Sequence, residues 1–306
     1  KGHAEPSAPK GLGPRGLARG AIPWRVGRLL RRLRRLAMTW VGRWLRPLAL
    51  AAFNSPAIKG LYIMRVCLIP LKTEPRNPSA NLERLVQCLA EIAHYQPDLI
   101  CLPECTFTGY LYAEDDFKQF AEPIPGPITE RMGQLARRHT THLCFGLLEV
   151  AESGVYNSAV LLDRKGKVIL KHRKIVEKPP FVNGDTVSSV DTELGRLGLL
   201  ICGDLFNEDV IRKLDPSLSL LIVPMARSFD KRSPDVDRWI SEERQMYIEA
   251  VKAVGITTLI VNALEINTDD PSFGGAMIVS ADGELLAESP HGTDNVLMWE
   301  FDRNGS

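Results

Sequence analysis

Residues 197–204 read LGLLICGD, an apolar run that stops on a cysteine and is followed at once by a glycine and an acid. The run is typical of a strand buried on both faces, because such strands read as continuous apolar segments. A thiol at the end of this strand would face the sheet edge, and the glycine permits unusual backbone angles. We therefore expect Cys202 to lie beside a cleft, with Gly203 supplying the turn.

A short helix is predicted directly after this turn, over residues 207–214. It starts with Asn207 as a capping residue, followed by two acids, and it ends with Arg212 and Lys213, in agreement with the helix dipole. We expect the start of this helix to favour the thiolate form of Cys202. Taken alone, however, a cysteine in an apolar run is more commonly a small core residue.

The surrounding sequence alternates between strand and helix patterns, which favours an α/β layered domain. The turn segments DRKGK and SADGEL lie between strands and indicate that part of the sheet is antiparallel. Further strands are expected at residues 61–70, 98–103, 141–150, 156–163, 167–172, 219–224, 257–262, 275–280 and 295–301. Amphipathic helices are expected at residues 81–95, 128–139 and 238–255.

Two other strands are followed by residues that could take part in catalysis. DLICLPECTFTGY (98–110) places Glu104, an acid flanked by apolar residues, in the loop after a buried strand, where it is suited to proton transfer. KVILKHRKIV (167–176) ends a strand on a basic cluster that includes Lys174. A solvated charge run remains the better interpretation of Lys171 and Arg173 in that cluster.

These pieces together resemble the nitrilase superfamily of carbon–nitrogen hydrolases. The matching motifs are LPE at Glu104, HRK at Lys174 and LLICGD at Cys202, in the order found in the family, supported by YNSAVLLDRKGKV and FGGAMIVSADGELLA. The resemblance runs from about Met64 to Asp302. It implies a four-layer αββα sandwich, usually paired as a homodimer, and a catalytic triad of glutamate, lysine and cysteine that needs neither a metal nor an organic cofactor.

In that family, the glutamate accepts the thiol proton and the cysteine attacks an amide, carbamoyl or nitrile carbon. From their chemistry, we expect the Lys174 ammonium and the Gly203 N–H to stabilise the oxyanion. The resemblance places a supporting glutamate at Glu149 in FGLLEVAE. Phe206, Arg227 and Trp239 fall in regions that line the family's substrate pocket. We expect a linear-amide amidohydrolase that acts through a thioester. The alternatives are an N-acyltransferase of the same superfamily and a non-catalytic binding protein that keeps the fold.

One departure from the family bears on the substrate. Many members carry a C-Y-D-L-R-F pattern, whereas this chain reads CGDLFNED, with no aromatic residue after Cys202 and no arginine a few residues on. The triad is unaffected by this change. The common substrate assignments of the family cannot be transferred on this motif.

The six cysteines are Cys67, Cys88, Cys101, Cys105, Cys144 and Cys202, with no C-x-x-C pair among them. Neither a zinc site nor a disulfide framework is therefore indicated, and a reducing, cytoplasmic location is expected.

Residues 1–63 contain thirteen basic residues and one acid, which is a net charge of +12. Because the whole chain has a net charge of +1, residues 64–306 have a net charge of −11. Hence we expect no nucleic-acid partner for the main domain. We assign residues 1–63 to a basic N-terminal extension and residues 64–306 to the hydrolase domain. Within the extension, residues 1–23 read as disordered. Residues 24–48 have apolar residues at helical spacing with arginines opposite, which is typical of a helix on an anionic membrane surface. The alternative is an overextended reading frame.

Overall fold

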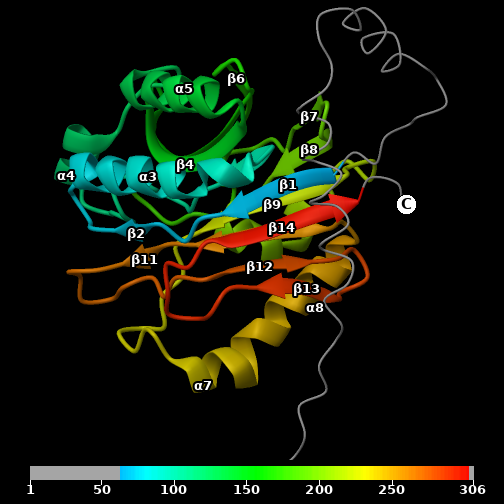
Figure 1. Ribbon diagram of the computed structural model, residues 1–306. Coiled ribbons are helices and arrows are strands. Elements are labelled where there is room, and N and C mark those ends of the chain that lie inside the picture. Colours follow the sequence, from blue (N-terminus) through cyan, green and yellow to red (C-terminus); the bar gives the residue numbers. More distant parts are fainter. Residues whose placement is uncertain (1–62, 303–306) are drawn as a thin grey trace, which may run out of the picture. The chain divides into compact units, whose positions relative to one another are not determined.

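The computed structural model describes residues 63–302, and these form two six-stranded sheets packed face to face with helices on their outer faces (Figure 1). The four-layer αββα sandwich expected from the sequence is confirmed. The predicted disordered segment 1–23 and the amphipathic helix 24–48 lie outside the described residues, and the domain boundary between residues 63 and 64 stays a prediction. None of the helices over residues 63–302 is long and apolar enough to cross a membrane.

The first sheet has the strand order β14-β1-β3-β4-β5-β6. Strands β1, β3 and β4 run parallel, whereas β14, β5 and β6 are antiparallel to their neighbours. The strands are β1 (Ile63–Leu68), β3 (Leu99–Cys101), β4 (His142–Ala151), β5 (Gly154–Leu162), β6 (Val168–Arg173) and β14 (Leu297–Asp302).

The second sheet has the order β13-β12-β10-β9-β8-β7, again with three parallel strands, β8, β9 and β10, at its centre. The strands are β7 (Ser189–Thr192), β8 (Gly195–Leu199), β9 (Leu220–Met225), β10 (Thr258–Asn262), β12 (Ala276–Val279) and β13 (Leu285–Glu288). A separate two-stranded parallel sheet joins β2 (Lys72–Thr73) and β11 (Leu264–Glu265).

The central core lies between the two large sheets, and strand β1 shows how the sequence builds it. Val66 and Leu68 point into the layer between the sheets, whereas Cys67 on the same strand points to the helix layer. Successive side chains of a strand face opposite sides, so an uninterrupted apolar strand serves two cores at once. This arrangement explains why the central strands read as continuous apolar runs.

Helices α3 (Pro78–Ile92) and α5 (Pro127–His139) cover the first sheet, and α8 (Arg244–Val254) covers the second. Leu85 and Leu89 of α3 pack in one cluster with Met132 of α5, which is the apolar face expected from their spacing. The remaining elements are η1 (Ala93–Tyr95), α4 (Glu114–Phe120), η2 (Cys202–Phe206), α6 (Glu208–Ile211), α7 (Val236–Arg238) and η3 (Trp239–Glu243).

Candidate active site

The three residues singled out by the strand-end motifs line one cavity of about 800 Å³. Glu104 follows β3, Lys174 follows β6, and Cys202 follows β8, so the first sheet supplies the carboxylate and the ammonium while the second supplies the thiol. Gly203 also lines this cavity. The structure thus brings together residues that are 70 positions apart in the chain, as for Glu104 and Lys174.

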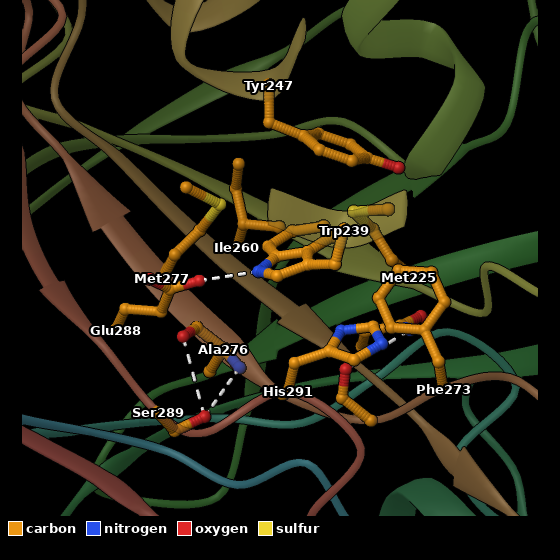
Figure 2. Close-up of a pocket in the computed structure, with 13 residues that line it drawn as sticks. Met225, Trp239, Tyr247, Ile260, Phe273, Ala276, Met277, Glu288, Ser289 and His291 are labelled. Atoms are coloured by element: carbon orange, nitrogen blue, oxygen red, sulfur yellow. Dashed lines mark hydrogen bonds between the residues drawn. The ribbon is translucent and has the colours of Figure 1, made fainter. Parts of the chain in front are cut away.

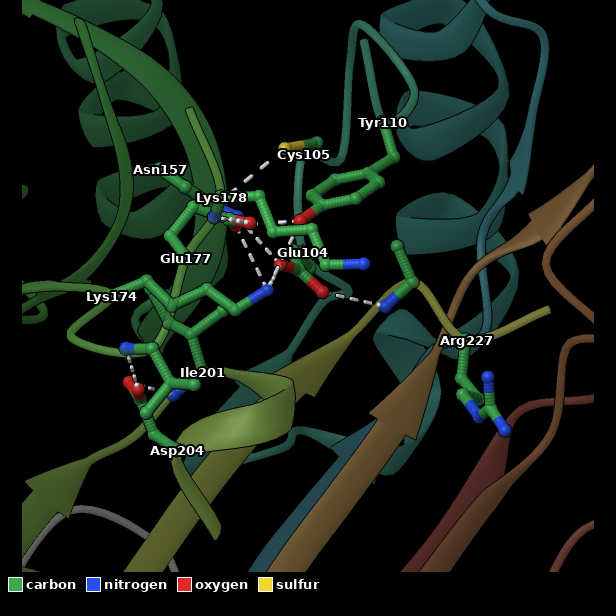
Figure 3. A network of polar contacts seen from close by, with 12 residues as sticks. Glu104, Cys105, Tyr110, Asn157, Lys174, Glu177, Lys178, Ile201, Asp204 and Arg227 are labelled. Carbon is green, nitrogen blue, oxygen red and sulfur yellow. Dashed lines mark hydrogen bonds and ion pairs between the residues drawn. The ribbon is translucent and has the colours of Figure 1, made fainter. Parts of the chain in front are cut away.

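Glu104 is almost fully buried, with 1% of its surface exposed, and its carboxylate bridges the two sheets. Its Oε1 accepts hydrogen bonds from Lys174 Nζ at 2.9 Å and from Asn157 Nδ2 at 2.6 Å. Its Oε2 accepts one from the Ala226 N–H, directly after β9, at 2.8 Å (Figure 3). These donors hold the carboxylate in one orientation at the cavity wall.

A second carboxylate, which the sequence reasoning missed, also holds Lys174. Glu177 Oε2 lies 3.0 Å from Lys174 Nζ, and it accepts hydrogen bonds from Tyr110 at 2.6 Å and Asn157 at 3.0 Å. The Lys174 ammonium therefore lies between two carboxylates and the Tyr110 hydroxyl, which is 3.2 Å away (Figure 3). The acid three residues after the lysine in KIVE was the available signal, but its side-chain direction depends on the loop conformation.

The charges in this network favour a permanently protonated lysine. Burial of the ammonium acts to lower the pKa of Lys174, but the charges of Glu104, Cys202 and Glu177 outweigh burial and raise that pKa well above its usual value. Burial acts to raise the pKa of Glu177, but the Lys174 ammonium and the Tyr110 hydroxyl lower it. Lys174 is thus a fixed positive charge at the cavity wall.

Cys202 begins the single turn η2 and is partly exposed. Burial and the carboxylate of Glu104 raise the pKa of the Cys202 thiol to about 12, although Lys174 and the Ala226 N–H lower it. The expected stabilisation of the thiolate by a following helix is therefore wrong. The helix α6 starts only at Glu208, and a helix dipole acts within its own first turn. A pKa raised in this way favours the neutral thiol at neutral pH.

The turn at the end of the strand differs from the expectation in one detail. The left-handed residue is Cys202 itself, with φ of 47°, and Gly203 has no positive φ. A non-glycine residue in this region costs about 1–2 kcal/mol, a strain that is typical of functional sites. Cys105, next to Glu104, is held in the same way with φ of 45°. A Cβ on Gly203 would meet only the Val176 carbonyl, at 4.0 Å, so neither the backbone nor the space at this position requires a glycine.

The structure does not place Glu149 beside Lys174, so the supporting role expected for it is corrected. The Glu149 carboxylate accepts hydrogen bonds from Lys171 Nζ at 2.8 Å, Arg173 Nη2 at 2.7 Å and Ser158 at 2.6 Å. Burial opposes its charge, but these three donors lower the pKa of Glu149 to about 2. It is a structural carboxylate that joins β4, β5 and β6, and Lys171 and Arg173 are its partners.

Of the three residues expected near the substrate, two line the cavity and one does not. Phe206 and Arg227 line it, and the Arg227 guanidinium donates to Glu243 at 2.9 Å. Trp239 instead lines a separate apolar cavity of about 20 Å³, together with Phe273 and His291 (Figure 2). This space is little larger than one water molecule needs, so it cannot hold a substrate.

His291 is partly buried in an aromatic stack beside this small cavity, with both ring nitrogens enclosed. Its ring lies 5.2 Å from that of Trp239 and 5.6 Å from that of Phe229, both nearly parallel. Neither ring nitrogen finds a hydrogen-bond partner among residues 63–302. Burial lowers the pKa of His291 below its usual 6.5, an effect that the nearby carboxylates of Glu288 and Asp235 oppose.

We expect this histidine to make the fold less stable in acid. The unfolded chain binds a proton near pH 6.5, whereas the folded His291 resists it, so stability is full above that pH and decreases as the pH falls towards the lowered pKa of the folded state. His291→Phe keeps an aromatic ring and removes the titrating group. Urea unfolding at about pH 7.5 and about pH 5.5 should therefore show a smaller loss in the variant than in the wild type. An unchanged loss would contradict the assignment.

Comparison with known proteins agrees with this geometry. The family model described as carbon-nitrogen hydrolase matches residues 65–306. A hydrolase encoded in the pqqF 5′ region of Pseudomonas protegens is 29% identical over 188 residues, which cover 59% of this chain and 65% of that protein. Omega-amidase NIT2 of Mus musculus is 25% identical over 253 residues, which cover 77% of this chain and 87% of the mouse protein.

Among solved structures, a carbon-nitrogen hydrolase from Helicobacter pylori G27 has the same fold, with a TM-score of 0.69 and 21% identity over 79% of this chain and 90% of the other. The family match covers nearly all of the described residues and includes the whole cavity. The chain therefore belongs to the carbon–nitrogen hydrolase family of the nitrilase superfamily, and it is a hydrolase that acts on carbon–nitrogen bonds other than peptide bonds.

Proposed function

We propose that this hydrolase cleaves linear amides through a thioester on Cys202, with Glu104 as general base and acid and Lys174 as electrostatic stabiliser. The observation that carries this proposal is the convergence of a neutral thiol, a buried carboxylate and a fixed ammonium on one cavity. A thiol whose pKa is raised to about 12 does not ionise alone at neutral pH, so the adjacent carboxylate of Glu104 is needed to accept its proton.

In the first half-reaction, Glu104 takes the thiol proton while the sulfur of Cys202 attacks the amide carbon. The negative charge that develops on the amide oxygen is stabilised by the Lys174 ammonium and by the Gly203 N–H. Such preorganised donors contribute about 3–4 kcal/mol each. Glu104 then gives its proton to the leaving nitrogen, the carbon–nitrogen bond breaks, and ammonia departs from the thioester.

In the second half-reaction, Glu104 takes a proton from water, and the resulting hydroxide attacks the thioester carbon. The carbon–sulfur bond breaks, the sulfur regains a proton through Glu104, and the acid product leaves. Dividing one difficult displacement into two steps is the advantage of a covalent nucleophile. Glu177 keeps Lys174 in place throughout, because it holds the ammonium at 3.0 Å as a second carboxylate beside Glu104.

Amides are proposed ahead of nitriles and carbamoyl compounds because the match to an omega-amidase covers 77% of this chain, whereas that to a bifunctional nitrilase/nitrile hydratase covers 45%. An acyltransferase would form the same thioester and pass the acyl group to an amine. A non-catalytic binding protein would have no need for the strained Cys202 turn beside two carboxylates and an ammonium.

The test is ammonia release by the full chain over a panel of linear amides, ω-amido acids, N-carbamoyl compounds and nitriles. Release from the amides, with the matching acid as product, is the expected result. The same panel with added hydroxylamine separates hydrolysis from acyl transfer, since an acyltransferase would form a hydroxamate in preference to the acid. If neither ammonia nor a hydroxamate forms from any compound of the panel, the catalytic proposal is refuted and the non-catalytic binding protein is favoured.

A further inference from the structure

Asp204 lies two residues after Cys202 and is fully buried, with 0% of its surface exposed. Its Oδ1 accepts two backbone hydrogen bonds, from Ile175 N at 3.0 Å and Val176 N at 2.8 Å. These are the two residues that directly follow Lys174. One carboxylate oxygen of the cysteine turn therefore holds the chain segment that carries the lysine.

The other oxygen of Asp204 holds the strand before the lysine and the turn itself. Its Oδ2 lies 2.8 Å from His172 Nε2 and 3.3 Å from the Ile201 N–H. His172 is buried, and its Nδ1 has no partner within residues 63–302, so the ring hydrogen belongs on Nε2, where it is donated to Asp204. All four contacts satisfy a buried charge that would otherwise be costly.

The two segments joined in this way belong to different sheets. Lys174 follows β6 of the first sheet, and Cys202 follows β8 of the second. At the cavity end, the Lys174 ammonium is fixed by Glu104 and Glu177. At the backbone end, Asp204 fixes the residues on both sides of the lysine, so both ends of a long flexible side chain are held.

The same carboxylate also supports the left-handed conformation of Cys202. Ile201, immediately before the cysteine, donates its N–H to the Asp204 side chain and accepts the Asp204 N–H at its carbonyl, at 3.0 Å. The turn is thus closed on both sides of Cys202, whose φ of 47° needs such support. A displacement of about 1 Å between reacting groups can cost about 100-fold in rate.

We propose that Asp204, with His172 as its partner, is a positioning residue. It holds the segment that carries Lys174 in a fixed position relative to the turn that carries Cys202. The inference rests on the proposed function for its effect on turnover, but not for its effect on the chemistry of the thiol. The Lys174 ammonium favours the Cys202 thiolate. If the two segments move apart, the pH at which the thiol becomes reactive therefore rises.

The test uses the full chain and two readouts: the steady-state kinetics of an amide that the panel identifies, and the pH dependence of Cys202 alkylation by iodoacetamide, located by mass spectrometry. Asp204→Asn keeps an oxygen for Ile175 and Val176 but turns an amide NH₂ towards the Ile201 N–H. We expect kcat to fall about 10- to 100-fold with little change in KM. The alkylation profile should shift to higher pH.

A pair of variants at His172 keeps the proposal testable if Asp204→Asn does not fold. His172→Gln keeps an N–H donor and should retain most of the activity and the wild-type alkylation profile. His172→Leu removes the donor and should reproduce the shift. Equal behaviour of these two variants would overturn the role of the hydrogen bond.

Asp98 supplies the matched control for an Asp→Asn change. Its carboxylate accepts from the Arg65 N–H at 2.9 Å and from Arg164 at 2.6 Å, at the start of β3 and away from the cavity. Asp98→Asn should lower thermal stability without moving the Cys202 profile. A wild-type profile and kcat in Asp204→Asn, or the same shift in Asp98→Asn, would overturn the proposal. If no amide is hydrolysed at all, the alkylation profiles still decide this inference independently of the proposed function.

Discussion

Cys202→Ala is expected to abolish ammonia release from every amide that the wild type hydrolyses, with a loss in kcat of roughly 10⁶-fold. No other nucleophile replaces the thiol, because the neighbouring Glu104 is engaged by Lys174, Asn157 and the Ala226 N–H. The fold should survive, since Cys202 is only partly buried and the substitution removes a single heavy atom. Circular dichroism and thermal unfolding verify this second part.

Cys105→Ala is the appropriate control for the loss of a thiol. Cys105 has the same left-handed backbone, lies next to Glu104, and has a pKa that burial raises well above its usual value. Its sulfur is fully enclosed and does not line the cavity. This variant should retain activity within about 10-fold of the wild type. Turnover by Cys202→Ala at the wild-type rate would refute the covalent mechanism.

The layers of the fold could be read from the sequence because the central strands are short, continuous apolar runs. Val66, Cys67 and Leu68 are all apolar, and such a run predicts a strand that is covered on both faces. The positions of Glu104 and Cys202 could be read as well, since each ends an apolar run. Such positions depend on chain order and strand length, which a single sequence contains.

The orientation of individual side chains could not be read in the same way. Glu149 and Glu177 are both acids near a strand end, yet only Glu177 contacts Lys174. Glu149 meets Arg173 instead because it lies on β4 and the pairing of β4, β5 and β6 aligns the two side chains. This difference depends on the register of the strands and on the path of the loop. Neither of these properties produces a pattern in the sequence.

The acidity of the Cys202 thiol could not be read from the sequence either. The helix predicted from Asn207 is present, because the Asn207 side chain caps α6, which begins at Glu208. The turn η2 separates this helix from the thiol, so its N-terminus does not favour the thiolate as expected. Burial and the Glu104 charge then dominate the thiol and raise its pKa to about 12. The mechanism consequently depends on a general base more heavily than the sequence implied.

That dependence makes Glu104→Gln the second variant with a large expected effect. The change keeps the size of the side chain and removes the group that accepts and returns the proton, so kcat should fall by about 10²- to 10⁴-fold. The alkylation of Cys202 should move in the opposite direction. The charge of Glu104 raises the pKa of the thiol, and its removal lowers that pKa, so more thiolate is present at neutral pH and iodoacetamide reacts faster.

Opposite changes in the two readouts separate a general base from a residue that merely supports the cavity. A structural loss would slow turnover without making the thiol more reactive. Glu177→Gln is the matched comparison, because Glu177 holds the same lysine but has no proton to exchange with the substrate in the proposed mechanism. Its kcat should fall less than that of Glu104→Gln. If Glu104→Gln loses turnover while alkylation also slows, Glu104 acts through the position of Lys174, and the base must be sought elsewhere in the cavity.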